Sequence, residues 1–259
     1  MSTPIVEMKD IKKHFGHVIA LGGVSFDVRE GECHCLLGDN GAGKSTFIKT
    51  MSGVHKPSAG QIFIDGQPVR FDSTRDAMEA GIATVYQDLA MIPLMSVSRN
   101  FWMGREPEKG IWPFRSLDMK KADAVTMEAM QQMGIQLRGP DQAVGTLSGG
   151  ERQTVAISRA VHFGARVLIL DEPTSALGVR QTANVLGTID RVRKQGIGVV
   201  FITHNVRHAM AVGDRFTVLN RGQTLGTAAR GEVDAAGLQD MMAGGQDLIE
   251  LEASLGGTV

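Results

Sequence analysis

The sequence predicts an α/β fold in which a phosphate-binding loop follows one strand of a parallel sheet, and two observations carry this prediction. The first is an apolar run at residues 33–37 followed directly by Gly-Asp-Asn-Gly-Ala-Gly-Lys-Ser at residues 38–45, which fits the pattern G-x-x-x-x-G-K-[ST]. The second is a pair of later apolar runs, at residues 166–171 and 197–202, with the composition of strands buried on both faces of a parallel sheet. The chain is therefore organised around a strand, a glycine-rich loop and a helix.

The glycine-rich loop has the chemistry that a bound triphosphate needs. Gly38, Gly41 and Gly43 leave room for backbone N–H groups to converge on phosphate oxygens, and the helix that opens near Lys44 points the positive end of its dipole at them. The Lys44 ammonium would reach the β- and γ-phosphates, and the Ser45 hydroxyl would bind Mg²⁺. The alternative is a glycine-rich turn that only joins strand to helix, which the flanking strand and helix disfavour. The predicted nucleotide-binding residues of this loop are Gly38, Asp39, Asn40, Gly41, Ala42, Gly43, Lys44, Ser45 and Thr46.

Length and charge limit the function classes. A chain of 259 residues holds one large α/β domain or a core domain with a small insertion. With 27 basic and 28 acidic residues the net charge is −1, so the sequence lacks the basic excess of nonspecific nucleic-acid binders, and no nucleic-acid partner is expected. No apolar run approaches the roughly 20 residues that span a bilayer, and the start lacks the features of a secretory signal. We expect a cytosolic protein whose membrane role requires a partner.

The N-terminal third predicts a small antiparallel sheet packed on the nucleotide core. Residues 4–15 and 18–28 alternate between apolar and polar side chains, and residues 61–64 followed by Asp65-Gly66 carry a hairpin signal. Cys33 and Cys35 lie two apart on one predicted strand, so their side chains share a face and cannot easily bridge. We expect both to be reduced core residues.

The middle of the chain has a different composition. A short strand at residues 82–86 ends at Gln87, and eight of the fourteen methionines lie between Met78 and Met133, with both tryptophans, Trp102 and Trp112, in the same region. Apolar residues keep helical spacing over 122–133. The methionines are typical either of an ordinary core or of a surface that adapts to a partner, and the composition leaves both interpretations open.

The C-terminal third predicts the remaining layers of the α/β core. Residues 179–193 and 205–212 have the pattern of helices that flank the sheet, and residues 214–220 and 223–228 that of terminal strands. A last helix is expected over 233–242, and the glycine-rich end at 251–259 is expected to be loose.

Further candidate residues follow the strands that lead toward the phosphate loop. Asp171 and Glu172 end one strand, where an aspartate suits Mg²⁺ and a glutamate suits the polarisation of an attacking water; the alternative is an acidic pair that caps the next helix. His204 follows another strand at the same edge, which favours a γ-phosphate contact over a structural histidine. Gln87 ends a third strand there, and by itself that placement indicates nothing.

A second glycine-rich helix start lies at residues 147–153, Leu-Ser-Gly-Gly-Glu-Arg-Gln. Ser148 would cap a helix running through Val155, and Gly149 and Gly150 leave its first amides open to an anion. A capped helix start is expected whether or not this helix end also binds an anion. Because the chain has one phosphate loop, two copies of it could each offer this helix end to the other.

Together these motifs resemble the ATP-binding subunits of ABC transporters, over the chain up to about Gly226. The loop at 38–45 is similar to the Walker A motif, Gln87 to the Q-loop, residues 147–153 to the signature, 168–172 to the Walker B strand with its catalytic glutamate, and His204 to the switch histidine. Phe15 matches the aromatic residue that stacks on adenine, although from the residues alone a core position is equally consistent.

This resemblance implies a P-loop NTPase core with an N-terminal antiparallel β-subdomain and an inserted α-helical subdomain at about 88–160, in a single domain over 4–246 followed by a tail at 247–259. It implies an ATPase that uses ATP and Mg²⁺ in a head-to-tail homodimer, with a membrane permease docked on the helical subdomain. The catalytic residues are Glu172, His204, Gln87 and Lys44, the metal ligands are Ser45, Gln87 and Asp171, and the nucleotide contacts add Phe15, Ser148, Gly149 and Gly150 to the phosphate loop.

One position departs from the family pattern. The family usually continues Ser-Ala-Leu-Asp after the Walker B strand, whereas this chain has Gly178 after Ser175-Ala176-Leu177. The missing carboxylate would normally contact the phosphate loop of the opposite subunit. The resemblance therefore leaves open how the two ATP sites of a dimer communicate.

Two further segments resemble one group within the family. Residues 86–89 (Tyr-Gln-Asp-Leu) and 100–107 (Asn-Phe-Trp-Met-Gly-Arg-Glu-Pro) are similar to importers of monosaccharides such as ribose, xylose and fructose. Members of that group commonly carry two ATPase domains, and single-domain forms include bacterial fructose-import subunits. The resemblance implies a peripheral subunit at the cytoplasmic face of the inner membrane, with a periplasmic sugar-binding protein as an indirect partner. The alternatives are an ATPase of another importer or exporter and a soluble ribosome- or nucleic-acid-associated protein.

Overall fold

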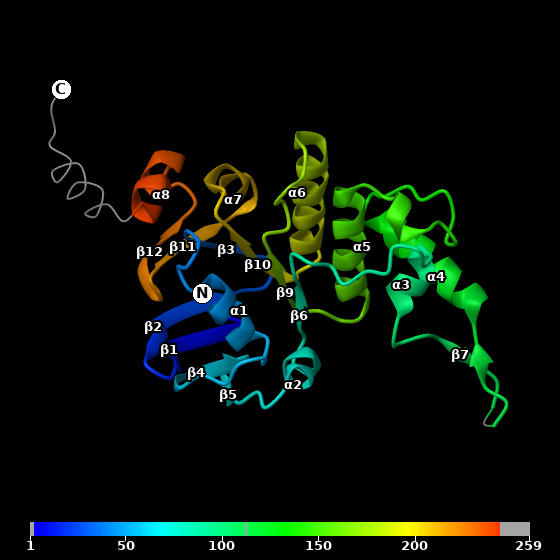
Figure 1. Cartoon of the computed structure of the whole chain (residues 1–259), viewed down its shortest axis with the longest axis horizontal. Coiled ribbons are helices and arrows are strands. Elements are labelled where there is room, and N and C mark those ends of the chain that lie inside the picture. The colour runs from blue at the N-terminus through cyan, green and yellow to red at the C-terminus, as the bar shows by residue number, and fades with distance from the viewer. Residues whose placement is uncertain (1–2, 112, 244–259) are drawn as a thin grey trace, which may run out of the picture.

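A computed structural model describes residues 3–111 and 113–243, and a largely parallel sheet forms its centre (Figure 1). Within these residues the sheet has the strand order β12-β11-β3-β10-β9-β6, and all neighbours are parallel except β11 and the edge strand β12. Its strands are β3 (Cys33–Leu37), β6 (Ile82–Val85), β9 (Val167–Asp171), β10 (Gly198–Thr203), β11 (Arg215–Asn220) and β12 (Gln223–Ala229). Every residue of β3 and β10 is buried, as expected for strands covered on both faces. The predicted parallel core is confirmed.

The second sheet is antiparallel and lies against one face of the first. Its order is β2-β1-β4-β5, formed by β1 (Val6–Phe15), β2 (Val18–Val28), β4 (Ala59–Ile64) and β5 (Gln67–Val69). Helix α1 (Lys44–Met51) lies between the two sheets, where its Phe47 and Ile48 pack into one cluster with Val24 of β2 and Ile202 of β10. The predicted antiparallel subdomain is therefore confirmed, and it holds α1 against the central sheet.

Helices cover the opposite face of the central sheet. They are α6 (Val179–Lys194), α7 (Val206–Val212) and α8 (Ala235–Met242), each within two or three residues of its predicted bounds. Val185 and Ile189 of α6 share a buried cluster with Phe201 of β10 and Phe216 of β11. Cys33 and Cys35 are buried free thiols, as expected. The loose end predicted for 251–259 lies outside the described residues.

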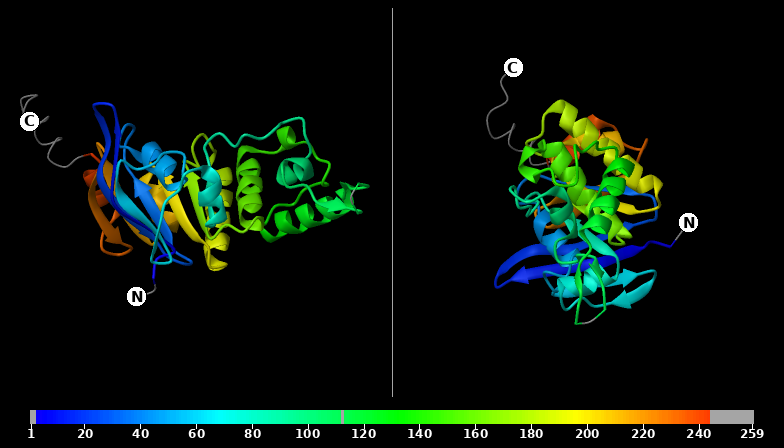
Figure 2. Two further views of the ribbon diagram at one scale, coloured as in Figure 1. Left: turned by 90° about the horizontal axis from the view of Figure 1, so that it is seen from below. Right: turned by 90° about the vertical axis from the view of Figure 1, so that its right-hand side faces the viewer.

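A helical lobe extends from one end of the sheet, away from the antiparallel strands (Figure 2). It contains α3 (Val97–Trp102), α4 (Met119–Gln132), the short helix η1 (Val144–Thr146) and a hairpin of β7 (Glu108–Lys109) and β8 (Ser116–Leu117). Helix α5 (Gly149–His162) joins the lobe to the core, because its Val155 lies in the lobe's apolar cluster and its Ile157 in that of the sheet. The proposed limits of one domain over 4–246 with an insertion at about 88–160 remain a prediction, and 244–259 lie outside the described residues.

The methionines of this region differ in burial, and the expectation that some of them contact a partner stays a prediction. Met130 and Met133 are buried in apolar clusters, whereas Met78 on helix α2 (Thr74–Glu79) is exposed. The Trp102 indole N–H donates to the Ala122 carbonyl at 3.0 Å and so ties α3 to α4, while Trp112 lies outside the described residues. None of the helices in the described ranges is long and apolar enough to cross a membrane.

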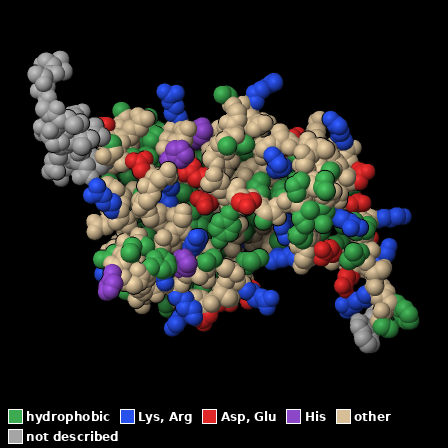
Figure 3. All heavy atoms as spheres, in the orientation of Figure 1, with side chains coloured by type: hydrophobic (Ala, Val, Ile, Leu, Met, Phe, Trp, Pro, Cys, Tyr) green, Lys and Arg blue, Asp and Glu red, His purple; other side chains and the backbone are tan. Residues whose placement is uncertain are grey.

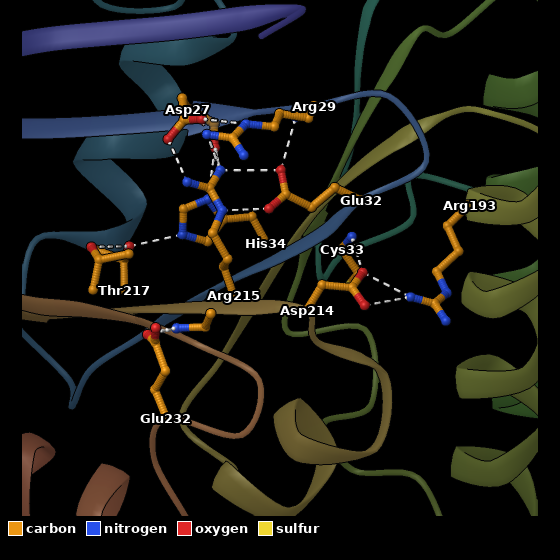
Figure 4. A network of polar contacts seen from close by, with 12 residues as sticks. Asp27, Arg29, Glu32, Cys33, His34, Arg193, Asp214, Arg215, Thr217 and Glu232 are labelled. Atoms are coloured by element: carbon orange, nitrogen blue, oxygen red, sulfur yellow. Dashed lines mark hydrogen bonds and ion pairs between the residues drawn. The ribbon is translucent and has the colours of Figure 1, made fainter. Parts of the chain in front are cut away.

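A network of charged groups joins the two sheets at the amino end of β3 (Figure 4). The Arg215 guanidinium of β11 forms ion pairs with Asp27 of β2 and with Glu32. Beside it the buried His34 ring lies between the Asp27 carbonyl, 2.6 Å from Nδ1, and the Thr217 hydroxyl, 2.8 Å from Nε2. Burial, together with the Arg215 charge, lowers the pKa of His34 to about 3. The network fixes the sheets at the edge opposite the phosphate loop.

Candidate nucleotide-binding and hydrolysis site

A cavity of about 540 Å³ opens at the carboxyl edge of the central sheet. Three strands end there, and each contributes one of the predicted segments: β3 the phosphate loop, β6 Gln87 and β9 the pair Asp171 and Glu172. The predicted residues that line it are Asp39, Asn40, Gly41, Gly43, Lys44, Ser45, Thr46, Gln87, Asp171 and Glu172. The topology therefore brings together residues as distant in the sequence as Asp39 and Glu172, since both the loop and the acidic pair lie at the carboxyl ends of parallel strands of one sheet.

The phosphate loop owes its shape to contacts with neighbouring backbone. Gly38 has φ +153° and Gly43 has φ +102°, in the region that L side chains rarely adopt. A Cβ atom on Gly38 would lie 2.4 Å from the Leu219 carbonyl oxygen, and one on Gly43 would lie 3.0 Å from the Ala20 carbonyl oxygen. Two of the glycines are thus required by the protein's own packing as well as by the approach of a ligand.

Lys44 is the buried cation of the cavity. Its Nζ donates to the carbonyls of Gly38 at 2.5 Å and Asp39 at 3.1 Å. Burial lowers the pKa of Lys44, while the nearby carboxylates of Glu172, Asp39 and Asp171 act in the opposite direction. The ammonium is held by neutral carbonyls, which a phosphate oxygen would replace as a stronger acceptor.

The acidic pair at the end of β9 combines burial with a constrained backbone. Burial raises the pKa of Asp171, and the charge of Glu172 adds to this effect. Glu172 has φ +48°, and its N–H donates to the Ile202 carbonyl at 3.0 Å. The Glu172 Oε1 atom lies 2.9 Å from Nδ1 of His204, which comes from the end of the neighbouring strand β10. The carboxylate and the imidazole predicted to act on the γ-phosphate end are therefore in direct contact, although His204 is not itself on the cavity wall.

The predicted metal ligands are compatible with Mg²⁺. Ser45, Gln87 and Asp171 line the same cavity and offer only hard oxygen donors besides the amide nitrogen of Gln87. Across the described ranges there is no cluster of three His, Cys, Asp or Glu side chains that could hold a metal ion. One carboxylate with a hydroxyl and an amide suits an ion that completes its octahedron with phosphate oxygens and water.

The signature residues Ser148, Gly149 and Gly150 do not line the nucleotide cavity of their own chain. Ser148 is the N-cap of α5: its Oγ accepts from the Glu151 N–H, and the Glu151 carboxylate accepts from the Ser148 N–H at 2.7 Å. A Cβ on Gly150 would lie 3.1 Å from the Gln181 carbonyl oxygen, so this glycine is also required where α5 packs on α6. Gly149 lines a neighbouring cavity of about 270 Å³ together with Gln87 and Glu172.

Phe15 is also absent from the wall of the nucleotide cavity. It ends β1 with 44% of its surface exposed and its ring 5.2 Å from that of His55, so it is not a core residue. The apolar wall comes instead from Val18 and Ile19 at the start of β2, which are 64% and 62% exposed. The charged Arg221, on the turn after β11, also lines the cavity. None of these residues was predicted from the sequence. The one available signal was two adjacent apolar residues at the exposed start of a strand.

The fold and the site define an ATP-binding cassette. The solved structure of a nucleotide-free ATP-binding cassette from an ABC transporter superposes with a TM-score of 0.79, covering 92% of this chain and 96% of that one at 22% sequence identity. A dimeric post-hydrolysis cassette, MJ0796 bound to ADP and Pi, superposes with a TM-score of 0.71 at 24% identity, covering 87% of this chain and 98% of that one. At this level of identity the likeness shows the shared fold.

Sequence relatives and a family model identify the family. The ABC transporter family model matches residues 21–175. The chain is 43% identical to the fructose import ATP-binding protein FrcA of Rhizobium meliloti, covering 86% of this chain and 87% of that protein. It is 40% identical to the xylose/arabinose import ATP-binding protein XylG of Sulfolobus acidocaldarius, covering 92% and 93%. It spans 43% of the length of a ribose import ATP-binding protein of Streptomyces avermitilis, at 42% identity over 85% of this chain. The chain belongs to the ABC transporter family, as an ATP-hydrolysing subunit, and the predicted fold is confirmed.

Proposed function

We propose that this ABC ATPase powers the import of a monosaccharide by closing and reopening a dimer around ATP. The observation that carries the proposal is the convergence of Lys44, Asp171 and Glu172 on one cavity, with His204 in contact with Glu172. Relatives that are similar over most of the chain are import subunits for fructose and for xylose or arabinose. The residues of the cavity support the ATPase part of the proposal. The import subunits among the relatives support the choice of a monosaccharide as substrate.

In the proposed mechanism Lys44 binds the β- and γ-phosphates, and Ser45, Gln87 and Asp171 hold Mg²⁺. When bound, the ion neutralises charge that develops on the phosphate oxygens during transfer. Glu172 acts as the general base toward the attacking water. His204 orients the Glu172 carboxylate through their 2.9 Å contact. The positive φ of Glu172 is a constrained backbone conformation of the kind that clusters at active sites.

A second copy of the chain completes each site in this proposal. Ser148 and Gly150 lie outside the nucleotide cavity of their own chain, so their role in ATP binding requires that they face the phosphate loop of a partner. Gly149 borders a second cavity that Glu172 also lines, and this supports a position of the signature helix next to the surface that a partner would cover. The dimer is thus proposed to be head to tail, with ATP between the two chains.

The groove beside the helical lobe is the proposed docking site for a helix of an integral membrane permease. It has a volume of about 330 Å³ and is walled by apolar residues of β6, the segment after it and α5, including Tyr86, Leu89 and Phe163. Arg159 lines it half-buried, donates to the Met103 carbonyl at 2.8 Å and has no ion pair among the described residues. This docking would place the chain peripherally at the cytoplasmic face of the inner membrane, with a periplasmic sugar-binding protein on the other side.

Fructose is the first sugar to test, because a fructose import subunit is similar over most of the chain. The competing assignments are another importer or exporter and a soluble ribosome- or nucleic-acid-associated protein. Charged side chains of both signs are interspersed over the face shown in Figure 3, which gives no extended basic surface on that face. The mixed charge disfavours the nucleic-acid alternative, and the import subunits among the relatives favour the importer assignment.

The experiment that tests the proposal is purification of tagged Glu172→Gln protein from detergent-solubilised native membranes with ATP and Mg²⁺, followed by mass spectrometry. We expect to recover a polytopic permease. The binding protein encoded with that permease can then be titrated with fructose, xylose and ribose. Recovery of ribosomes or nucleic acid without a membrane subunit would overturn the transport assignment while leaving the ATPase intact. Recovery of a permease whose binding protein binds none of the three sugars would contradict the assignment of a monosaccharide as substrate.

A further inference from the structure

A second histidine, beside His204, connects the two loops that carry Glu172 and His204. His208 lies on α7, one turn beyond His204, and its Nδ1 is 2.9 Å from the hydroxyl of Thr174, which is two residues after Glu172 and buried. On its other side Nε2 is 3.4 Å from the side-chain amide nitrogen of Asn205, the residue after His204. One imidazole therefore contacts residues beside both catalytic candidates.

The surrounding contacts determine which tautomer His208 adopts. Asn205 caps α7, and its Oδ1 accepts the His208 main-chain N–H at 3.2 Å, so the amide nitrogen of Asn205 is the atom that faces the imidazole. Because the Asn205 amide nitrogen is a donor, Nε2 of His208 must accept its hydrogen bond. In the neutral ring the proton then lies on Nδ1, which donates to the Thr174 hydroxyl. Burial and the neighbouring His204 lower the pKa of His208, while the Glu172 charge acts in the opposite direction, so the neutral ring is favoured.

The segment that Thr174 anchors is strained at two positions. Glu172 has φ +48° and Ala176 has φ +57°, and such residues keep this conformation only when other contacts hold them. The Ser175 N–H donates to the Glu172 carbonyl at 3.0 Å and closes a tight turn around Thr174. A side-chain contact to Thr174 therefore acts on the orientation of Glu172 itself.

We propose that His208 is a positioning residue for ATP hydrolysis, which holds the turn after Glu172 against the loop of His204 through Thr174 and Asn205. This positioning role rests on the proposed roles of Glu172 and His204. His208 touches neither of them within hydrogen-bond distance and does not line the nucleotide cavity. Its loss is expected to reduce the rate of the chemical step and to leave ATP binding unchanged.

The test is a double-mutant cycle on the purified full chain, with kcat and KM for ATP measured by phosphate release. His208→Ala and the isosteric Thr174→Val are each expected to lower kcat by roughly 10- to 100-fold at unchanged KM, since small displacements of a reacting group have effects of this order. The double variant should be no slower than the slower single variant, because both changes break the same contact. His208→Asn, whose amide nitrogen can donate to Thr174, should recover part of kcat.

Arg207→Ala, on the adjacent exposed position of α7, is the matched control and should keep wild-type kinetics. Losses of kcat that add in the double variant, unchanged kcat in both single variants, or a rise in KM at constant kcat would each overturn the proposal. Glu172→Gln is assayed in parallel to separate the two hypotheses. If Glu172→Gln hydrolyses ATP normally, the assignment of the base is wrong; if it is inactive and His208→Ala is normal, only the positioning role is wrong.

Discussion

Nδ1 of His204 lies 2.9 Å from Oε1 of Glu172, although the two residues end different strands and are separated by a whole βα unit in the sequence. The contact exists because β9 and β10 are adjacent parallel strands whose carboxyl ends meet at one edge, with Asp171 paired beside Ile202. The candidate base and the residue that orients it are thus positioned by the same pair of strands.

Glu172→Gln is expected to lower kcat by about 100-fold or more, because the amide cannot accept the proton of the attacking water. ATP binding should persist, and size-exclusion chromatography with ATP and Mg²⁺ should show a dimer that the wild type forms only transiently. Glu232→Gln, at an exposed acid that does not line the cavity, is the control. A Glu172→Gln protein with normal turnover would remove this residue from the mechanism.

Lys44→Ala is expected to weaken ATP binding by roughly 10- to 100-fold, which corresponds to the loss of a charged hydrogen bond of about 1.5–3 kcal/mol. Fluorescence titration with a labelled nucleotide measures the effect. Lys49→Ala on the exposed face of the same helix serves as the matched control, since its side chain does not line the cavity. Equal affinities of the two variants would contradict the assignment of Lys44.

Gly178→Asp is expected to change the cooperativity of ATP hydrolysis between two copies more than the affinity for ATP. Gly178 is the N-cap of α6 without a side-chain cap, and no described atom lies within 4 Å of a Cβ added there. The added carboxylate therefore fits. Because aspartate is a better N-cap residue than glycine, the substitution should raise the free energy of unfolding by about 0.3 kcal/mol. Gly178→Ala adds the Cβ without the carboxylate and separates the two effects. A Hill coefficient that stays the same in Gly178→Asp would limit the substitution to helix capping.

Stability is expected to fall in acid because of His34. Its folded-state pKa of about 3 lies below the ordinary value of 6.5, so between these values the unfolded chain binds a proton that the folded chain does not. The free energy of unfolding should lose about 1.4 kcal/mol per pH unit from this group as pH falls from 6 to 4.

Urea unfolding over this range measures the slope in the wild type, in His34→Leu and in the exposed-histidine control His17→Gln. His34→Leu should be less stable at pH 7, because the Thr217 hydroxyl and the Asp27 carbonyl lose a partner, and its slope should be flatter. Parallel slopes for the wild type and His34→Leu would show that the ring is charged in the folded protein.

Arg159→Glu is expected to prevent association with the permease while ATP hydrolysis by the isolated chain stays the same. The guanidinium lines the docking groove far along α5 from the signature glycines, and it lacks a carboxylate partner among the described residues. Co-purification from native membranes measures association, and Arg159→Lys, which keeps the charge, is the control. Loss of basal hydrolysis in Arg159→Glu would show that the groove also supports the active site.

Much of this architecture could be read from local patterns. The strand that ends at Leu37, the loop after it and the helix that opens at Lys44 are contiguous, so backbone preference and apolar composition are enough to place them. The short helix α2 and the β7–β8 hairpin were missed because each spans too few residues to show a period. The capping box of Ser73 and Asp76 was the one available signal for α2.

The sequence by itself determined the family, the phosphate loop and the residue types that end each core strand, since these are short patterns in which neighbours along the chain do the chemistry. The tertiary structure alone decided which of these residues meet. It brought His204 into contact with Glu172 and His208 into contact with Thr174. It also gave the nucleotide cavity a wall that contains Val18 and Ile19 and does not contain Phe15. The physical reason is that such contacts depend on the order of strands in the sheet and on the turns after them, and periodicity along the chain carries no information about either.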